Sequence, residues 1–280
     1  MSVYLFPGQG SQTKGMGAAV FKAFPEVIAI ANDILGYSIV ELSDDNERLN
    51  QTQYTQPALY VVNALTYYQK IEETHQKPQF AAGHSLGEYN ALLAADVFDF
   101  ETGLALVKKR GELMSQATGG SMAAIIGLRV EDIHSILKQE NLPNISIANY
   151  NSYTQIVISG PANTIAVAQP IFEKAGADLF VPLKVSGAFH SPHMQAAKQS
   201  FKDFLNQFQF NNPSIPVIAN INAKPYQPHA IASSLAEQIT SPVLWTTTIE
   251  YLLGQGETEF MEIGEGTVLT GLMRRIKNGQ

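Results

Sequence analysis

Short apolar runs alternate with longer segments of helical periodicity along the first part of the chain. Residues 3–6 form an apolar, extended run, and residues 18–35 are mostly helix-forming. Residues 56–71 repeat apolar side chains at helical spacing and are entered through Pro57, a residue tolerated in the first turn of a helix. A further helix-like segment covers residues 100–116. This alternation of strand and helix predicts an α/β fold.

The pattern changes after Gly119 and Gly120, which close that helix-like segment. From there the elements read strand, helix, strand, strand, helix, strand, at residues 122–127, 130–140, 145–149, 155–160, 161–176 and 178–185. This β-α-β-β-α-β order is that of a ferredoxin-like unit. The chain then returns to the first pattern, with strand-like runs at residues 215–220 and 259–263 and a final helix at residues 267–276.

Composition excludes several classes of protein. The formal net charge is −7, which disfavours nucleic acid as a partner because phosphate neutralisation needs clustered Lys and Arg. The absence of cysteine rules out disulfides, a thiolate nucleophile and thiolate metal sites. No basic N-terminal segment precedes a long apolar one, and no stretch approaches the roughly twenty apolar residues of a membrane span. We therefore expect a soluble, cytoplasmic protein with no membrane partner.

The most informative motif is Gly-x-Ser-x-Gly at residues 83–87. In this turn a serine stands between the end of a strand and the start of a helix, so that its hydroxyl faces a cleft. Residues 80–82 are small and apolar, and residues 88–95 are rich in helix formers, as the motif requires on its two sides. The sequence therefore predicts Ser85 as the nucleophile of an acyl-transfer enzyme.

A serine hydroxyl needs a base, because its own pKa leaves almost no alkoxide near neutral pH, and imidazole is the usual choice. His190 is favoured because it follows the apolar run 185–189, where the inserted unit rejoins the first pattern and a cleft is expected. His193 is the alternative base, and a third interpretation makes His190 only a loop cap. The other four histidines lie on the strained turn, in a helix of the insert and in two polar segments: His84, His134, His75 and His229.

Six segments, in order, carry a resemblance to a known family: Phe6-Pro7-Gly8-Gln9-Gly10-Ser11-Gln12, Gln56-Pro57-Ala58, Gly83-His84-Ser85-Leu86-Gly87-Glu88-Tyr89, Arg110-Gly111, Gly187-Ala188-Phe189-His190-Ser191, and Gly264-Glu265-Gly266 with Leu269-Thr270-Gly271-Leu272. Over essentially its whole length the chain resembles the malonyl-CoA:acyl carrier protein transacylases, including the freestanding acyltransferases that load modular polyketide synthases. The resemblance implies an α/β-hydrolase-like core of residues 1–120 and 189–280, a ferredoxin-like subdomain of residues 121–188, and a cleft between them.

The resemblance also implies roles for particular residues. Ser85 matches the family nucleophile, and His190 matches its base, whose ring N–H is oriented by the backbone carbonyl of Gln238 instead of a carboxylate. The backbone N–H groups of Gln9 and Leu86 match the oxyanion hole. The expected reaction moves a malonyl group from malonyl-CoA to the phosphopantetheine thiol of an acyl carrier protein, in fatty acid or polyketide synthesis, with no metal and no further cofactor.

Two residues are expected to select the substrate. Arg110 matches an arginine that clamps the free carboxylate of the malonyl group, whereas Lys108 and Lys109 beside it are expected to form a solvated helix face. Phe189 is expected to lean over the α-carbon and disfavour methylmalonyl groups, or else to be only core packing. An acyl-thioester hydrolase and a non-catalytic carrier-binding subunit are the alternative functions. Basic residues on two helices are candidates for docking an acidic carrier: Arg274, Arg275 and Lys277, or Lys108 and Lys109.

Overall fold

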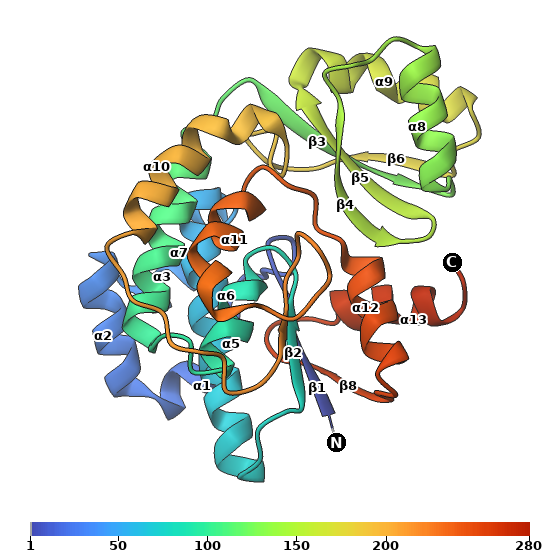
Figure 1. Cartoon of the computed structure of the whole chain (residues 1–280). Coiled ribbons are helices and arrows are strands. Elements are labelled where there is room, and N and C mark those ends of the chain that lie inside the picture. The colour runs from blue at the N-terminus through green and yellow to red at the C-terminus, as the bar shows by residue number, and fades with distance from the viewer. Residues whose placement is uncertain (1) are drawn as a thin grey trace.

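Two four-stranded sheets organise the computed structural model, which describes residues 2–280 (Figure 1). The first sheet has the order β7-β2-β1-β8 and is parallel throughout, and the second has the order β4-β5-β3-β6 and is antiparallel. The strands are β1 (Ser2–Phe6), β2 (Phe80–Gly83), β3 (Gly120–Ile126), β4 (Ser146–Ser152), β5 (Gln155–Pro161), β6 (Leu179–Pro182), β7 (Val217–Ile218) and β8 (Glu259–Glu262).

Helices cover both sheets. They are α1 (Ala18–Ala23), α2 (Pro25–Leu35), α3 (Ile39–Asp44), α4 (Asn46–Leu49), α5 (Thr52–Thr74), α6 (Gly87–Ala94), α7 (Phe100–Ser115), α8 (Val130–Gln139), α9 (Ala162–Lys174), α10 (Gln195–Leu205), α11 (Ile231–Gln238), α12 (Trp245–Gly254) and α13 (Val268–Lys277), with 3₁₀ turns η1 (Pro192–Met194) and η2 (Pro228–Ala230). Within residues 2–280, none of these helices combines the length and the apolar character needed to cross a membrane.

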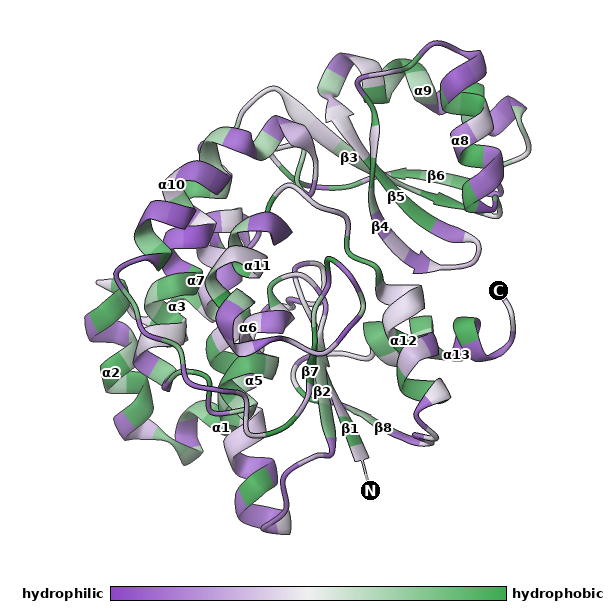
Figure 2. Ribbon diagram, viewed as in Figure 1, coloured by the Kyte–Doolittle hydropathy of each residue, from purple (hydrophilic) through white to green (hydrophobic). Residues whose placement is uncertain are grey.

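The parallel sheet lies between two layers of helices, and this explains why its strands read as apolar runs. Tyr4 and Phe6 of β1 pack into the larger core with α5, α6 and α7, whereas Val3 and Leu5 pack into a second cluster with α12 and α13. The hydrophobic residues gather on the strands and on the helix faces that turn towards them (Figure 2). In sheets of this kind, ligands bind in the crevice beyond the carboxyl ends of the strands, so a functional site is expected at that edge.

The antiparallel sheet forms a separate unit with its own apolar core. Helices α8 and α9 lie on one face of it, where Ile133, Phe172 and Phe180 belong to one buried cluster (Figure 1). The strand order β4-β5-β3-β6 is that of a ferredoxin-like fold, so the predicted fold class, an α/β core with an inserted ferredoxin-like unit, is confirmed. The boundaries predicted for the unit, residues 121–188, stay a prediction.

The unit is joined to the core at two places. The chain crosses between them twice, and the crossings touch, because a Cβ built on Gly120 would lie 2.2 Å from the backbone nitrogen of Ala188. At the other edge, β4 bonds to the segment before α12. Val243 N donates to Ala148 O and Tyr150 N donates to Val243 O, both at 2.9 Å. Thr246 Oγ1 also donates to Tyr150 O at 2.9 Å.

Two predicted helices have different limits in the structure. The segment 18–35 is broken in two at Pro25, because the residue before a proline is disfavoured in helical conformation. The helix predicted for residues 56–71 begins at Thr52 and ends at Thr74, so Pro57 lies inside α5 and not at its first turn. A proline this close to the start removes a single backbone hydrogen bond, and the buried apolar face of α5 outweighs that loss.

Two predicted strands are shorter than expected. The run 178–185 is a strand only as far as Pro182. Leu183 N still donates to Met122 O of β3 at 2.9 Å, and the chain then turns, with Val185 N donating to Leu183 O at 3.0 Å. Residues 215–220 reduce to β7, because the backbone N–H of Asn220 leaves the ladder and donates to the side chain of Glu88. Helices α10, α11 and α12, and the short α3 and α4, are elements that the sequence analysis did not predict.

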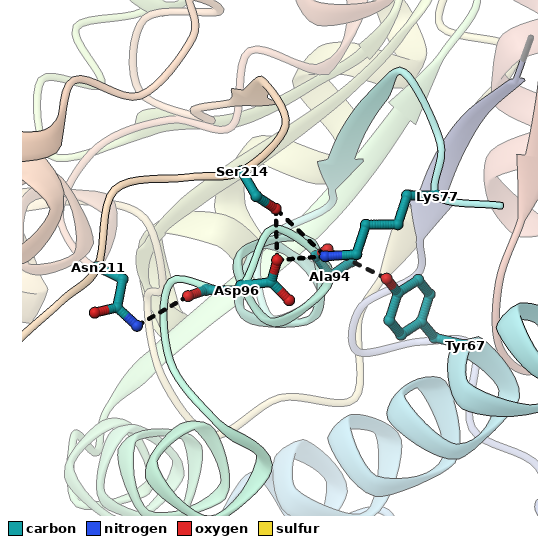
Figure 3. A network of polar contacts seen from close by, with 6 residues as sticks. All are labelled: Tyr67, Lys77, Ala94, Asp96, Asn211 and Ser214. Carbon is teal, nitrogen blue, oxygen red and sulfur yellow. Dashed lines mark hydrogen bonds and ion pairs between the residues drawn. The ribbon is translucent and has the colours of Figure 1, made fainter. Parts of the chain in front are cut away.

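A polar network ties the end of α6 to the connection that leads into β7 (Figure 3). Asp96 accepts hydrogen bonds from Lys77 Nζ and, at 2.6 Å, from Ser214 Oγ, while its backbone carbonyl accepts from Asn211 Nδ2 at 3.1 Å. Tyr67 of α5 donates to the backbone carbonyl of Ala94 at 3.2 Å. The network fixes the segment that enters β7 next to β2, the strand that precedes the Gly-x-Ser-x-Gly turn.

Candidate active site

The Gly-x-Ser-x-Gly turn connects β2 directly to α6. Ser85 has a φ of 52°, the left-handed region that a non-glycine residue enters only at a cost. A Cβ built on Gly83 would lie 1.9 Å from the backbone of Gly87, so the strand and the helix approach each other as only glycine allows. Asn220 holds the turn from β7, accepting from Ser85 N and donating to Gly83 O, both at 2.7 Å. The strained serine is thus fixed by its neighbours.

Ser85 and His190 meet at the edge of the parallel sheet. Ser85 Oγ lies 2.7 Å from His190 Nε2, and His190 Nδ1 lies 2.9 Å from the backbone carbonyl of Gln238 and 3.1 Å from that of Ser241. Two carbonyl acceptors require the proton on Nδ1, which leaves Nε2 free to accept the serine proton. The ring is 4% exposed, and burial together with the Arg110 charge lowers the pKa of His190 to about 3. The imidazole is therefore neutral at physiological pH.

A buried guanidinium completes the group. Arg110 of α7 is 1% exposed, and its Nη2 donates to Ser85 Oγ at 3.1 Å and to Gln238 Oε1 at 2.9 Å. Its Nη1 donates to Gln56 Oε1 at 2.6 Å, and its plane lies over the ring of Tyr89. Burial lowers the pKa of Arg110, although the ordinary value is so high that the group stays charged. Nη1 has two N–H groups and only the one facing Gln56 has an acceptor within residues 2–280, so the cation has a donor left for a ligand.

A buried carboxyl stands behind the serine. Glu88 is fully buried and accepts hydrogen bonds from Asn220 N at 2.9 Å, from the hydroxyl of Tyr226 at 2.8 Å and from Gln238 Nε2. Burial raises the pKa of Glu88 to about 7, against the opposing effect of these donors and of Arg110. The site therefore contains a cation and a titratable acid within one hydrogen-bonded group.

A pocket of about 480 Å³, partly open to solvent, lies in front of Ser85, between the core and the inserted unit. Gln9 and Leu86, the predicted oxyanion-hole residues, both line it, and neither of their backbone N–H groups has an acceptor in the described part of the chain. Apolar side chains from both parts of the molecule form the rest of the wall: Met114, Met122, Leu183, Val185 and Phe189. Such a cavity can hold an acyl group and keep water from it.

Phe189 is buried, and its ring lies against Gly187, where an added Cβ would come within 2.7 Å. It lines the pocket and also belongs to the main apolar cluster. Phe189 therefore contributes to core packing, and an effect on substrates would be additional to that role. Lys108 Nζ donates to the backbone carbonyl of Ile34 at 2.8 Å and Lys109 lies over Phe204, so the predicted solvated face is only half exposed.

The structure brings His190, and not His193, to the serine. His193 is exposed, and its Nε2 bonds to the carbonyl of Asn144 at 3.1 Å. His84 also lines the pocket but is engaged with Asn151 Oδ1 at 2.8 Å. The remaining three are exposed and lie at the end of α5, in α8 and in η2: His75, His134 and His229.

Sequence reasoning missed four partners of the site: Glu88, Asn220, Tyr226 and the carbonyl of Ser241. A signal existed for Asn220, because it is a polar residue at the carboxyl end of a parallel strand next to β2. None existed for Glu88, whose donors come from residues more than 130 positions away. No group of three or more His, Asp or Glu side chains that could hold a metal occurs among residues 2–280.

Comparison with known proteins gives the chain its family. Residues 3–277 match the family model described as acyl transferase domain. The chain is 56% identical to the polyketide biosynthesis protein PksE of Bacillus subtilis and 54% identical to the polyketide biosynthesis malonyl CoA-acyl carrier protein transacylase PksC of the same organism, each over 99% of its length. It spans 37% of PksE and 97% of PksC.

Among solved structures, the chain is similar to malonyl CoA-acyl carrier protein transacylase from Burkholderia pseudomallei, with a TM-score of 0.96 at 50% identity, covering 100% of this chain and 99% of that one. The strained serine in its turn, the imidazole that can take its proton and the mostly apolar pocket define a serine-dependent acyl-group site. The chain belongs to the acyl transferase domain family.

Proposed function

We propose that this protein transfers a malonyl group from malonyl-CoA to the phosphopantetheine thiol of an acyl carrier protein through an ester on Ser85. The observation that carries the proposal is the guanidinium of Arg110, 3.1 Å from the hydroxyl of Ser85 in a mostly apolar pocket. An uncharged acyl group would leave this cation unpaired, which is costly, whereas a carboxylate beside the thioester would pair with it. The names of the relatives PksC and the Burkholderia transacylase support the same substrates.

In the first half of the reaction, Ser85 Oγ attacks the thioester carbonyl while its proton passes to His190 Nε2, 2.7 Å away. The carbonyl oxygen becomes an oxyanion facing the backbone N–H groups of Gln9 and Leu86. The bond between carbonyl carbon and sulfur then breaks, and the coenzyme A thiolate leaves with the proton from the imidazolium. The carbonyls of Gln238 and Ser241 hold the ring in the tautomer that this requires.

In the second half the carrier thiol takes the place of the serine. His190 accepts the thiol proton, sulfur attacks the ester carbonyl, and the proton returns to Ser85 Oγ as the ester bond breaks. The ester has to avoid water between the two halves. The apolar pocket wall and the pairing of the malonyl carboxylate with Arg110 favour an incoming thiol over hydrolysis. For this reason we prefer transfer to the alternative, an acyl-thioester hydrolase, which would use the same serine and histidine.

Mass spectrometry of the intact protein tests the proposal. Mixed with a panel of acyl-CoAs, the wild type should gain one malonyl mass, mapped to Ser85, and should pass it to a phosphopantetheinylated carrier. Ser85→Ala, which removes only the hydroxyl, should abolish the adduct and the transfer, with its circular dichroism unchanged. An adduct that survives this change would refute the assignment. Release of free malonate instead of acyl carrier would favour the hydrolase.

The setting of the reaction follows the same proposal. We infer that the transfer serves polyketide or fatty acid synthesis in the cytoplasm. We also infer that the catalytic core comprises residues 1–120 and 189–280 and that residues 121–188 form the subdomain. Arg274, Arg275 and Lys277 are exposed on α13 and remain candidates for docking an acidic carrier. Lys108 is a weaker candidate, because its ammonium group is engaged by the carbonyl of Ile34.

A further inference from the structure

Glu88 is a buried carboxyl that the reaction proposed above does not use. One of its oxygens accepts from Asn220 N and from the hydroxyl of Tyr226, at 2.9 and 2.8 Å. The other accepts from Gln238 Nε2. Every polar group that these bonds bring to Glu88 is a donor, so these bonds favour the carboxylate, in opposition to burial, which raises the pKa. A buried charge is costly unless it is paired and hydrogen-bonded, and Glu88 lies only three residues after Ser85.

The side chain of Gln238 connects this carboxylate with the rest of the site. Its Nε2 also donates to the backbone carbonyl of Ser85 at 2.8 Å, and its Oε1 accepts from Arg110 Nη2 at 2.9 Å. The amide therefore has two acceptors at its nitrogen and a cation at its oxygen. Turning it over would set its NH₂ against the guanidinium and its oxygen against Glu88 and a carbonyl. The orientation of this amide is fixed by the charges on either side of it.

We propose that Glu88 is a positioning residue for acyl-group selectivity. Its carboxylate sets the orientation of the Gln238 amide, and the amide oxygen holds Arg110 in the position where the guanidinium binds the substrate carboxylate. The inference rests on the proposed malonyl transfer. Arg110 is held on its other nitrogen by Gln56 Oε1 at 2.6 Å, so the guanidinium plane is fixed at two points. A bidentate pair with a carboxylate needs that plane in place.

The substitution Glu88→Gln shows what the charge does. The oxygen of the new amide would face the donors Asn220 N and Tyr226 OH, and its NH₂ would face the NH₂ of Gln238. Turning the Gln238 amide relieves that clash but sets its NH₂ against Arg110 and gives up the bond to Ser85 O. Arg110 then loses an acceptor. Malonyl loading should fall, whereas loading of an acetyl group, which has no carboxylate to be read, should change much less.

The pH dependence of the malonyl-to-acetyl ratio provides a second test of the inference. Three groups with charge or a titratable proton face Glu88: Arg110 from α7, Tyr89 from α6 and Tyr226 from the loop after β7. Arg110 stays charged, and burial raises the pKa values of both tyrosines. The pKa of Glu88 is about 7 and that of His190 is about 3. Among these groups only Glu88 changes charge near neutrality, so selectivity should be present above pH 7 and decline below it.

The experiment measures self-acylation of the full chain by malonyl-CoA and by acetyl-CoA, scored by intact mass, and compares the ratio of the two rates. Glu88→Gln should lower the malonyl-to-acetyl ratio about 10- to 100-fold, the range of a hydrogen bond to a charged group. Gln238→Met, which keeps the carbonyl that orients His190, should lower it similarly, and the double variant should be no worse than either alone. Tyr226→Phe removes a donor from the same carboxylate without touching Gln238. Because that donor lowers the pKa of Glu88, the variant should move the pH midpoint of the ratio upward, and it is the matched control at alkaline pH, where Glu88 is ionised in both proteins.

The wild-type ratio should also fall as the pH is lowered from 8 to 6, and it should be flat in Glu88→Gln. An unchanged ratio in folded Glu88→Gln, or an equal loss in Tyr226→Phe at alkaline pH, would overturn the inference and make Glu88 structural. If Glu88→Gln does not fold, the inference is tested by Gln238→Met and by the pH dependence of the wild-type malonyl-to-acetyl ratio. The inference is overturned if the wild-type ratio does not change with pH and the ratio in Gln238→Met equals that of the wild type. A wild type that takes no malonyl group at all refutes the proposed function instead, so the two failures are distinguishable.

Discussion

The two sheets of this molecule differ in what they bury. Around the carboxyl ends of the parallel sheet, three side chains that carry or can carry charge are buried together: Glu88, Arg110 and His190. In the antiparallel unit, every Asp, Glu, Lys, Arg and His of residues 120–182 is exposed, and the core is an apolar cluster around Phe172. Buried charge costs free energy unless it is fully paired, so the first region gives up stability to hold a reactive arrangement.

This difference separates two kinds of mutational effect. Changes in the polar group around Ser85 should alter rates and selectivity with modest effects on folding. Changes in the apolar cluster of the inserted unit should alter the free energy of unfolding and leave selectivity alone. Four substitutions test this separation, and they are given in decreasing order of expected effect.

Removing the base should have the largest effect. His190→Ala should slow malonylation of Ser85 by about 10²–10⁴-fold or more, because the nucleophile and base act as a unit. The measurement is the rate of adduct formation by intact mass. His193→Ala is the matched control, since that ring is exposed and bonded to Asn144. Near-normal rates in His190→Ala, with His193→Ala inactive, would transfer the role of base to His193.

The core of the inserted unit should respond in stability alone. Phe172→Ala removes a fully buried ring that stacks on Phe180, and it should lower the free energy of unfolding by about 3–5 kcal/mol in urea denaturation. The malonyl-to-acetyl ratio of the remaining folded protein should not move. Val167→Ala on the same helix, at a side chain 58% exposed, should change stability by less than about 0.5 kcal/mol. A shifted ratio in Phe172→Ala would break the separation between the two regions.

Arg110 should act on one substrate and not on the other. Arg110→Ala should reduce malonyl loading by about 100-fold, since a bidentate pair supplies two charge-assisted hydrogen bonds. Acetyl loading should be spared or improved, because the unpaired buried cation is gone. Parallel assays with the two CoA esters decide the point. An equal loss for both would make Arg110 a structural residue.

The smallest effect concerns the α-carbon of the acyl group. Wild-type protein should prefer malonyl over methylmalonyl by roughly 10- to 200-fold, the discrimination that one methyl group allows, if the ring of Phe189 leans over that carbon. Phe189→Ser should raise methylmalonyl transfer, measured by competition between the two CoA esters and the mass of the loaded carrier. Equal loading by the wild type, or no gain in a folded variant, would leave Phe189 as core packing only.

The fold class could be predicted from the sequence because the decisive elements carry strong patterns, such as the buried run of β1 and the long periodicity of α7. Helix α10 also had a readable pattern, with Ala197, Phe201 and Leu205 four residues apart, and it was overlooked. Helix α12 did not. Its first turn contains three consecutive threonines, which favour strands, and burial of Trp245 decides the conformation.

The residues of the candidate site also divide into those that the local sequence predicts and those that it does not. Ser85 is marked by a local motif, and His190 by its place after the inserted unit. Glu88 lies inside the recognised segment, yet nothing local reveals its environment, because Asn220, Tyr226 and Gln238 reach it from other elements. A hydrogen-bonded group assembled from distant segments becomes visible only when the fold brings those segments together.

The attachment of β4 to Val243 has a mechanical consequence for the ester on Ser85. The two crossings near Gly120 and Ala188 are covalent and packed on each other, whereas the opposite side is held by non-covalent contacts. Two hydrogen bonds join β4 to Val243 and one comes from Thr246, and Asn151 and Tyr153 add bonds to His84, to Glu250 and to the backbone carbonyl of Gln280. Any rotation of the inserted unit away from the pocket would have to break these bonds and turn about the crossings. If Ser85 carries the proposed ester, the contacts along β4 would therefore help to set its lifetime against water.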